Sequence, residues 1–165
     1  MPALKTGKIA PDVELPAVGG TRISLKEALR EGPVVLAFFK ISCPVCQYAF
    51  PYLERLYRNY PGAAVRFIGV SQNGEQDTRT FMREFGITFP IALDPEGKYP
   101  VSNAYGITNV PTIFYLARDG EVQVSSVGWI RDDMQKINEL IAGNIGDGIP
   151  PLFKPGEQVA DFRAG

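Results

Sequence analysis

The 165-residue chain is almost neutral, with 17 lysines and arginines against 18 aspartates and glutamates. This balance provides no strongly basic surface for nucleic acid or an anionic membrane, so neither partner is expected. A composition of 45% hydrophobic and 21% charged residues is that of one globular domain with a full-sized core.

The first half of the chain predicts a short helix, a buried strand and a longer helix. Residues 24–27 have the S-x-x-E pattern of a capping box, which marks the start of the short helix. The run VVLAFFK at 34–40 is β-branched or aromatic, which indicates a strand buried on both faces of a partly parallel sheet. Apolar residues then recur at helical spacing over 44–60, with Pro51 expected as a kink.

The second half alternates between strands and helices. We expect, in chain order, a buried strand at 64–72, a helix at 75–86, a short segment at 89–94, one or two helical turns at 98–106, two strands joined by a turn at 112–129 and an amphipathic helix at 131–143. The two joined strands would finish the sheet with an antiparallel edge, and the last helix would cover a sheet face. The tail from Asn144 is rich in glycine and proline and is expected to be irregular.

The only two cysteines, Cys43 and Cys46, stand at the start of the longer helix. If Cys43 is the N-cap, Pro44 takes the first helical position, where its missing N–H costs nothing. The unpaired backbone N–H groups and the helix dipole there favour the thiolate, which is the nucleophilic form of cysteine. The i,i+3 spacing brings the two sulfurs near bonding range, so the pair predicts a centre that interconverts between dithiol and disulfide.

The start of the chain carries no sign of export. The segment MPALKTGKIAPD lacks a basic stretch followed by a long apolar stretch, and the run VVLAFF is too short to cross a bilayer. The cytoplasm is therefore the expected location. A C-x-x-C in a cytoplasmic chain indicates redox or metal chemistry.

Three other interpretations of the cysteine pair stay open. A structural disulfide across so short a loop would stabilise the fold by only about 2 kcal/mol, and the cytoplasm rarely preserves one. A zinc site needs four ligands, and the chain has two cysteines and no histidine. Two inert buried thiols would be unusual at a helix start opened by proline. The absence of histidine also removes imidazole as a base, and we expect neither a metal nor another cofactor.

These features together resemble the thioredoxin-like superfamily. The similarity is to its branch of peroxiredoxin/alkyl hydroperoxide reductase (thiol-specific antioxidant) proteins and bacterial thiol-disulfide oxidoreductases of cytochrome maturation. It covers about residues 6–142 and rests on GKIAPDVELPAVGGTRISLKEAL, VVLAFFKISCPVC and NVPTIFYLARDGEV. It implies an α/β thioredoxin-like fold, with a central mixed sheet flanked by helices and an N-terminal hairpin extension. We therefore expect a thioredoxin-like (redoxin) domain over 1–143 and an irregular C-terminal tail over 144–165.

The resemblance also implies a reaction and roles for individual residues. One cysteine would attack a substrate disulfide, and the other would resolve the mixed disulfide. A cis peptide bond before Pro111 would turn the preceding backbone toward an extended substrate segment. The expected partners are disulfide-bearing proteins or small thiol substrates, together with an external reductant. The predicted site residues are Cys43 (attacking) and Cys46 (resolving) as catalytic residues, and Pro44, Val45, Val110 and Pro111 as substrate-binding residues.

The chain departs from the family pattern at positions that bear on the chemistry. Ala37 and Ala49 stand where relatives place a carboxylate, so both usual proton acceptors for Cys46 are missing. The T-P-V-C signature of peroxiredoxins is C-P-V-C here, so Cys43 replaces the hydroxyl that binds peroxide, and the arginine of that site aligns near Val110. We therefore rank thiol-disulfide exchange first and thiol peroxidase activity second. A non-catalytic thioredoxin-like binding module or redox sensor is the third hypothesis.

Overall fold

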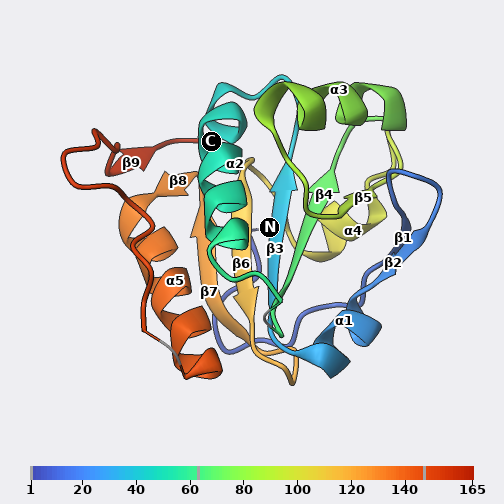
Figure 1. Cartoon of the computed structure of the whole chain (residues 1–165). Helices are drawn as coiled ribbons and strands as arrows, with labels where there is room; N and C mark the ends of the chain where they lie inside the picture. The colour runs from blue at the N-terminus through green and yellow to red at the C-terminus, as the bar shows by residue number, and fades with distance from the viewer. Residues whose placement is uncertain (1, 63, 147) are drawn as a thin grey trace.

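A computed structural model describes residues 2–62, 64–146 and 148–165 of the chain (Figure 1). Its five-stranded central sheet has the order β5-β4-β3-β6-β7. The strands are β3 (Val34–Phe39), β4 (Arg66–Ser71), β5 (Ile91–Leu93), β6 (Thr112–Leu116) and β7 (Val122–Val127). The first three run parallel, β6 pairs antiparallel with β3, and β7 pairs antiparallel with β6. The predicted mixed sheet with an antiparallel edge is therefore confirmed.

Within the described residues, five helices cover the two faces of this sheet. They are α1 (Leu25–Glu31), α2 (Pro44–Arg58), α3 (Glu75–Phe85), α4 (Pro100–Ala104) and α5 (Arg131–Ile145). Residues of α2, α3 and α5 form one hydrophobic core with one face of the sheet. Residues of α1, α4 and the N-terminal segment form a second core on the other face. Figure 1 shows α2 and α5 in front of the sheet.

Strand β3 is buried on both faces because it lies between these two cores. Val35, Ala37 and Phe39 belong to the core under α2, and the three alternate side chains belong to the core under α1 and α4. All six side chains are at most 1% exposed. Successive side chains of a strand point to opposite faces of the sheet, and both faces at β3 are covered by an apolar core. This explains why the apolar run is uninterrupted.

Local signals in the sequence fix where the helices begin and end. The Ser24 hydroxyl accepts a hydrogen bond from Glu27 N at 3.3 Å, which confirms the predicted start of α1. Helix α3 ends at Gly86, whose φ of 70° is readily adopted by glycine. Pro51 lies inside α2, and the helix continues past it to Arg58.

The N-terminal hairpin is also present. Strands β1 (Glu14–Pro16) and β2 (Arg22–Ser24) pair antiparallel, with Leu15 opposite Ile23. An isolated bridge between Ala17 and Ala92 attaches the hairpin to the β5 edge of the sheet. The predicted hairpin extension is confirmed.

The C-terminal tail is more ordered than the sequence predicts. Helix α5 runs to Ile145, past the predicted end at residue 143, because Ile145 packs against the core under α2 and the left-handed residue that ends the helix is Gly146. The tail finishes in β9 (Phe162–Arg163), which pairs antiparallel with β8 (Trp129–Ile130). The expectation of an irregular segment is wrong at these two places, and the predicted boundary between domain and tail lies inside α5.

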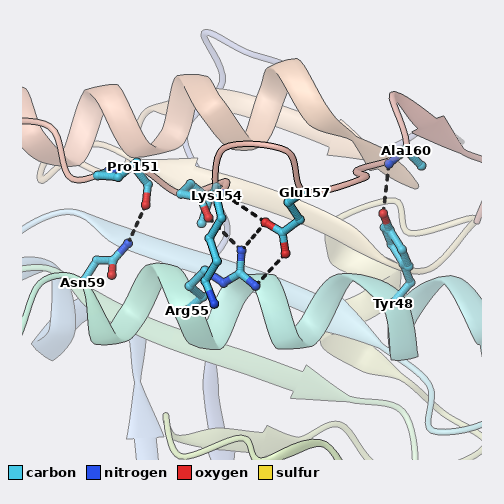
Figure 2. Close-up of polar contacts among 8 residues, drawn as sticks. Tyr48, Arg55, Asn59, Pro151, Lys154, Glu157 and Ala160 are labelled. Atoms are coloured by element: carbon cyan, nitrogen blue, oxygen red, sulfur yellow. Dashed lines mark hydrogen bonds and ion pairs between the residues drawn. The ribbon is translucent and has the colours of Figure 1, made fainter.

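The tail lies along α2 and is bonded to it (Figure 2). The Arg55 guanidinium donates to both carboxylate oxygens of Glu157, at 2.7 and 2.9 Å, and to Leu152 O at 3.0 Å. Leu152 is 1% exposed and belongs to the core under α2. Two further hydrogen bonds join the tail to the helix, from Asn59 Nδ2 to Pro151 O and from Ala160 N to the Tyr48 hydroxyl. The tail is therefore a packed layer of the domain.

We find no helix long and apolar enough to cross a membrane in the part of the chain that the structure describes.

We predict that the contact between Arg55 and Glu157 makes stability depend on pH in acid. Hydrogen bonds from Arg55 lower the pKa of Glu157 from 4.5 to about 2. Since the pKa is lower in the folded state, the carboxylate stabilises the fold above about pH 4.5, and this contribution is lost as the pH falls toward about 2. Urea unfolding of the parent and of Glu157→Gln should show the parent more stable at about pH 7, with the difference shrinking toward zero near pH 2. A difference that stays constant over this range would assign the contribution to uncharged contacts.

Candidate active site

The two cysteines lie at the end of β3, where α2 begins. Cys43 is the N-cap of α2, with extended φ and ψ of −83° and 116°, and Pro44 is at the start of the helix. The Cys43 sulfur accepts a hydrogen bond from Cys46 N at 3.3 Å. Both residues are free thiols, with Cys43 partly exposed and Cys46 fully buried. The predicted position of both cysteines at the start of one helix is confirmed, and the structure adds that Cys43 is the outer and Cys46 the inner sulfur.

Side chains from two elements hold the turn that precedes the cysteines. Asn73, just after β4, accepts a hydrogen bond from Ile41 N at 3.0 Å through Oδ1. Gln47 of α2 donates from Nε2 to Ile41 O at 2.9 Å. The sequence interpretation missed both residues. For Asn73, the available signal was the polar stretch SQN at the end of a buried parallel strand, because the carboxyl ends of neighbouring parallel strands meet at one edge of a sheet.

The loop before β6 brings a backbone carbonyl to the outer sulfur. The Val110-Pro111 peptide bond is cis, as the resemblance implied. In its thiol form, Cys43 donates from Sγ to Val110 O at 3.3 Å. Pro111 is buried, and its carbonyl accepts a hydrogen bond from Gly128 N at 2.8 Å. The loop is therefore anchored on the β7 side while Val110 faces the sulfur.

The predicted substrate-binding residues differ in exposure. Pro44 is exposed beside Cys43, and Val110 is partly exposed on the opposite loop. Val45 is partly buried and packs against the core under α2, and Pro111 is buried. Pro44, Val45 and Val110 thus keep some accessible surface, and Pro111 does not. The binding role of all four residues stays a prediction.

The environment of the inner sulfur disfavours its charged form. Burial raises the pKa of the Cys46 thiol well above its ordinary value, and the hydrogen bond with Cys43 acts in the same direction. The backbone and the charge of Lys40 at the end of β3 oppose this shift without reversing it. The Cys46 thiol is therefore protonated at neutral pH.

The surroundings of Cys46 offer no obvious carboxylate to take this proton. Ala37 and Ala49 lie with Cys46 in one hydrophobic core, and both are at most 1% exposed. Glu54, the buried acid of α2, is engaged by Thr88 and Arg58 through hydrogen bonds of 2.6–2.8 Å. Among the described residues, the titratable groups that act on the pKa of Cys46 are Cys43 and Lys40. The deficit that the sequence predicted persists in the folded site.

Two arginines that a peroxide site could recruit are engaged elsewhere. Arg118 follows β6, at the end of the strand away from Cys43, and its guanidinium donates to Arg30 O. Arg131 lies 3.9 Å from an Asp161 carboxylate oxygen, and its guanidinium is 5.1 Å from the centre of the Phe153 ring. No cluster of three or more potential metal-binding side chains is found over 2–62, 64–146 and 148–165.

Comparisons with known proteins agree with the fold and with the cysteine pair. The AhpC/TSA family matches residues 6–125. A protein named thiol-disulfide oxidoreductase ResA, from Halalkalibacterium halodurans, is 32% identical over 139 residues, covering 83% of this chain and 77% of that protein. The crystal structure of a putative thiol:disulfide interchange protein DsbE from Chlorobium tepidum matches with a TM-score of 0.75 and 26% identity, covering 87% of this chain and 100% of that chain. Peroxidoxin BcpB from Mycobacterium tuberculosis matches with a TM-score of 0.67 and 22% identity over 87% of this chain and 97% of that one, a likeness of fold alone.

We predict that iodoacetamide modifies Cys43 and spares Cys46 in the folded, reduced protein at about pH 7. Cys43 is accessible, whereas Cys46 is buried and its raised pKa keeps the thiol protonated. Mass spectrometry of the modified peptides measures both rates, and Cys46 should react only after unfolding in denaturant or at strongly alkaline pH. Equal modification of the two cysteines in the folded protein would contradict this assignment.

Proposed function

This chain belongs to the AhpC/TSA family and is a thiol-disulfide oxidoreductase, and we propose that Cys43 is its attacking sulfur and Cys46 its resolving sulfur. One observation carries the proposal. Cys43 caps α2 with a partly exposed sulfur, and that sulfur contacts both Cys46 N and Val110 O. The outer sulfur is thus accessible, close to the positive end of a helix and beside its partner cysteine.

In the first step, the Cys43 thiolate attacks one sulfur of a substrate disulfide. A bond forms between Cys43 Sγ and that sulfur, the substrate S–S bond breaks, and the second substrate sulfur leaves as a thiolate. The hydrogen bond from Cys46 N to Cys43 Sγ stabilises the charged nucleophile before the attack. The product is a mixed disulfide between enzyme and substrate.

In the second step, Cys46 attacks the Cys43 sulfur of the mixed disulfide. An intramolecular disulfide forms, and the remaining substrate sulfur leaves as a thiolate, so that two electrons have passed to the substrate. Cys46 must first lose its proton. Since its surroundings offer no evident carboxylate for this, we assign the proton to a departing substrate thiolate or to water. This resolution step should therefore be the slow step at neutral pH.

The substrates that we propose are protein disulfides in extended segments, and small disulfides that reach the same sulfur. Thiol-disulfide oxidoreductases act on disulfide-bearing protein substrates. The Val110 carbonyl beside Cys43 suits a backbone laid along the loop, with exposed Pro44 on the opposite side. An external reductant has to return Cys43 and Cys46 to thiols after each cycle.

We predict that the two serine variants behave differently. Cys43→Ser should abolish disulfide reduction, because the attacking sulfur is lost, while serine still caps α2. Cys46→Ser should accumulate mixed disulfides, since attack proceeds and resolution does not. Reduction of insulin by the prereduced protein, with non-reducing electrophoresis of the products, measures both effects. Trapping by Cys43→Ser instead would reverse the two roles, and a parent that reduces no disulfide would favour the binding module or redox sensor.

Thiol peroxidase activity is the second candidate function, favoured by the AhpC/TSA match and by the alignment of Cys46 with a peroxidatic cysteine. The buried, protonated Cys46 and the engaged Arg118 and Arg131 oppose it. We predict that the reaction with peroxide is slow and that its rate increases linearly with the concentration of hydrogen peroxide, without saturation. Peroxide consumption measured over a range of concentrations checks this. Rapid turnover with a low Michaelis constant would move peroxide reduction to first place.

A further inference from the structure

The last residues of the tail reach the loop that faces Cys43. Figure 1 shows the C-terminal end beside the start of α2. Asn109 donates from Nδ2 to Gly165 O at 3.2 Å. A Cβ placed on Gly165 would collide with Val110 O and lie 2.9 Å from Val110 C and 3.4 Å from Pro111 N. The backbone at Gly165 is therefore packed against the same carbonyl that contacts the Cys43 sulfur.

Close backbone packing positions this end of the tail. Strand β9 pairs with β8, with Arg163 opposite Trp129. A Cβ on Gly128, the residue before β8, would lie 2.5 Å from Arg163 O and 3.1 Å from Gly165 N. Glycine at position 128 thus leaves the space in which the tail backbone lies. The Arg163 guanidinium is 4.1 Å from the centre of the Tyr48 ring of α2.

The end of the tail is held less firmly than the part before it. Upstream, Arg55 binds Glu157 through two hydrogen bonds, and Leu152 is in the core. Residues 161–165 are all exposed, and the Phe162 side chain is 62% exposed. Asp161 O accepts a hydrogen bond from Arg131 N at 3.0 Å, whereas residues 162–165 are held by a two-residue strand pairing, the Asn109 bond and the contact of Arg163 with the Tyr48 ring. Such a segment is able to detach while the rest of the tail stays bound.

We propose that residues 162–165 act as a built-in competitor of protein substrates. This inference rests on the proposed function, in which an extended substrate backbone lies along Val110. Two backbones do not fit on that carbonyl at once, so a protein substrate has to displace the tail end before its disulfide reaches Cys43. A small disulfide can approach the sulfur without lying along the loop, so it does not have to displace the tail end. The tail end therefore favours small disulfides over protein disulfides.

The test compares the parent with the same chain shortened to residue 161. Stopped-flow oxidation of the prereduced proteins is followed with insulin and, separately, with bis(2-hydroxyethyl) disulfide. Shortening should raise the second-order rate constant for oxidation by insulin by about 3- to 10-fold, the size of effect expected from losing a few exposed contacts. The rate with the small disulfide should be unchanged. An unchanged or lower insulin rate would overturn the inference.

Two single substitutions separate this effect from a general change in the tail. Asn109→Ala removes the hydrogen bond to Gly165 O. It should raise the rate of oxidation by insulin as shortening does, but by a smaller factor. Asn59→Ala removes the equivalent amide bond to Pro151 O at the other end of the tail and serves as the matched control, with no change expected. Equal effects of the two substitutions would also overturn the inference.

A measurement without turnover keeps the inference separate from the proposed function. Two mixed disulfides are prepared at Cys43 of the Cys46→Ser variant by chemical activation, one with an extended cysteine peptide and one with 2-mercaptoethanol. Amide hydrogen exchange of residues 162–165 is then measured in each adduct. The peptide should increase exchange there, and 2-mercaptoethanol should not. The same exchange with both adducts would overturn the competitor role even if disulfide reduction is fast. If the parent reduces neither disulfide, the proposed function is wrong, and the exchange result alone decides the role of the tail.

Discussion

The Cys43 sulfur is the point on which the architecture of the site depends. It satisfies the N–H of Cys46 at the start of α2 and also reaches the carbonyl of Val110 on a loop far away in sequence. A single atom therefore joins the helix start, the end of β3 and the loop before β6. The buried strand makes this possible, because its position between two cores leaves little freedom in where it delivers the turn at Ile41. Asn73 and Gln47 then remove the freedom that remains in that turn.

The second constraint is the apolar environment of the inner sulfur. Phe39 and Phe50 pack with their ring centres 4.3 Å apart and their planes tilted by 43°, within the core that contains Cys46, Ala37 and Ala49. Carboxylates at these alanine positions would have to be buried in this core, which costs free energy unless they are paired. The chain therefore keeps a well-packed core and gives up a dedicated proton acceptor. The reaction is left to draw on solvent or on the substrate for that proton transfer.

The sequence predicted the elements whose signals are local, and it missed contacts between distant segments. The apolar run at 34–40, the capping box at 24–27 and the proline-opened helix each depend on a few neighbouring residues, and each was placed correctly. The bond between Arg55 and Glu157 joins residues 102 positions apart, and each residue alone resembles an ordinary surface charge. Gly128 likewise has meaning only once the tail backbone lies on it. Periodicity carries no information about such pairs, and the cis bond at Pro111 was predicted through family resemblance alone.

The hydrogen bond from Ala160 to Tyr48 gives the end of the tail a very short tether. Only four residues lie between Ala160 and Gly165, so residues 162–165 stay close to the loop when they detach from it. Short flexible tethers of this kind confer an effective concentration of about a millimolar. A free peptide of equal intrinsic affinity would need a comparable concentration to occupy half of the loops. A protein partner present at micromolar concentration would therefore need additional contacts outside the loop. Those contacts, rather than the segment that carries the partner's cysteine, would determine which partner is recognised.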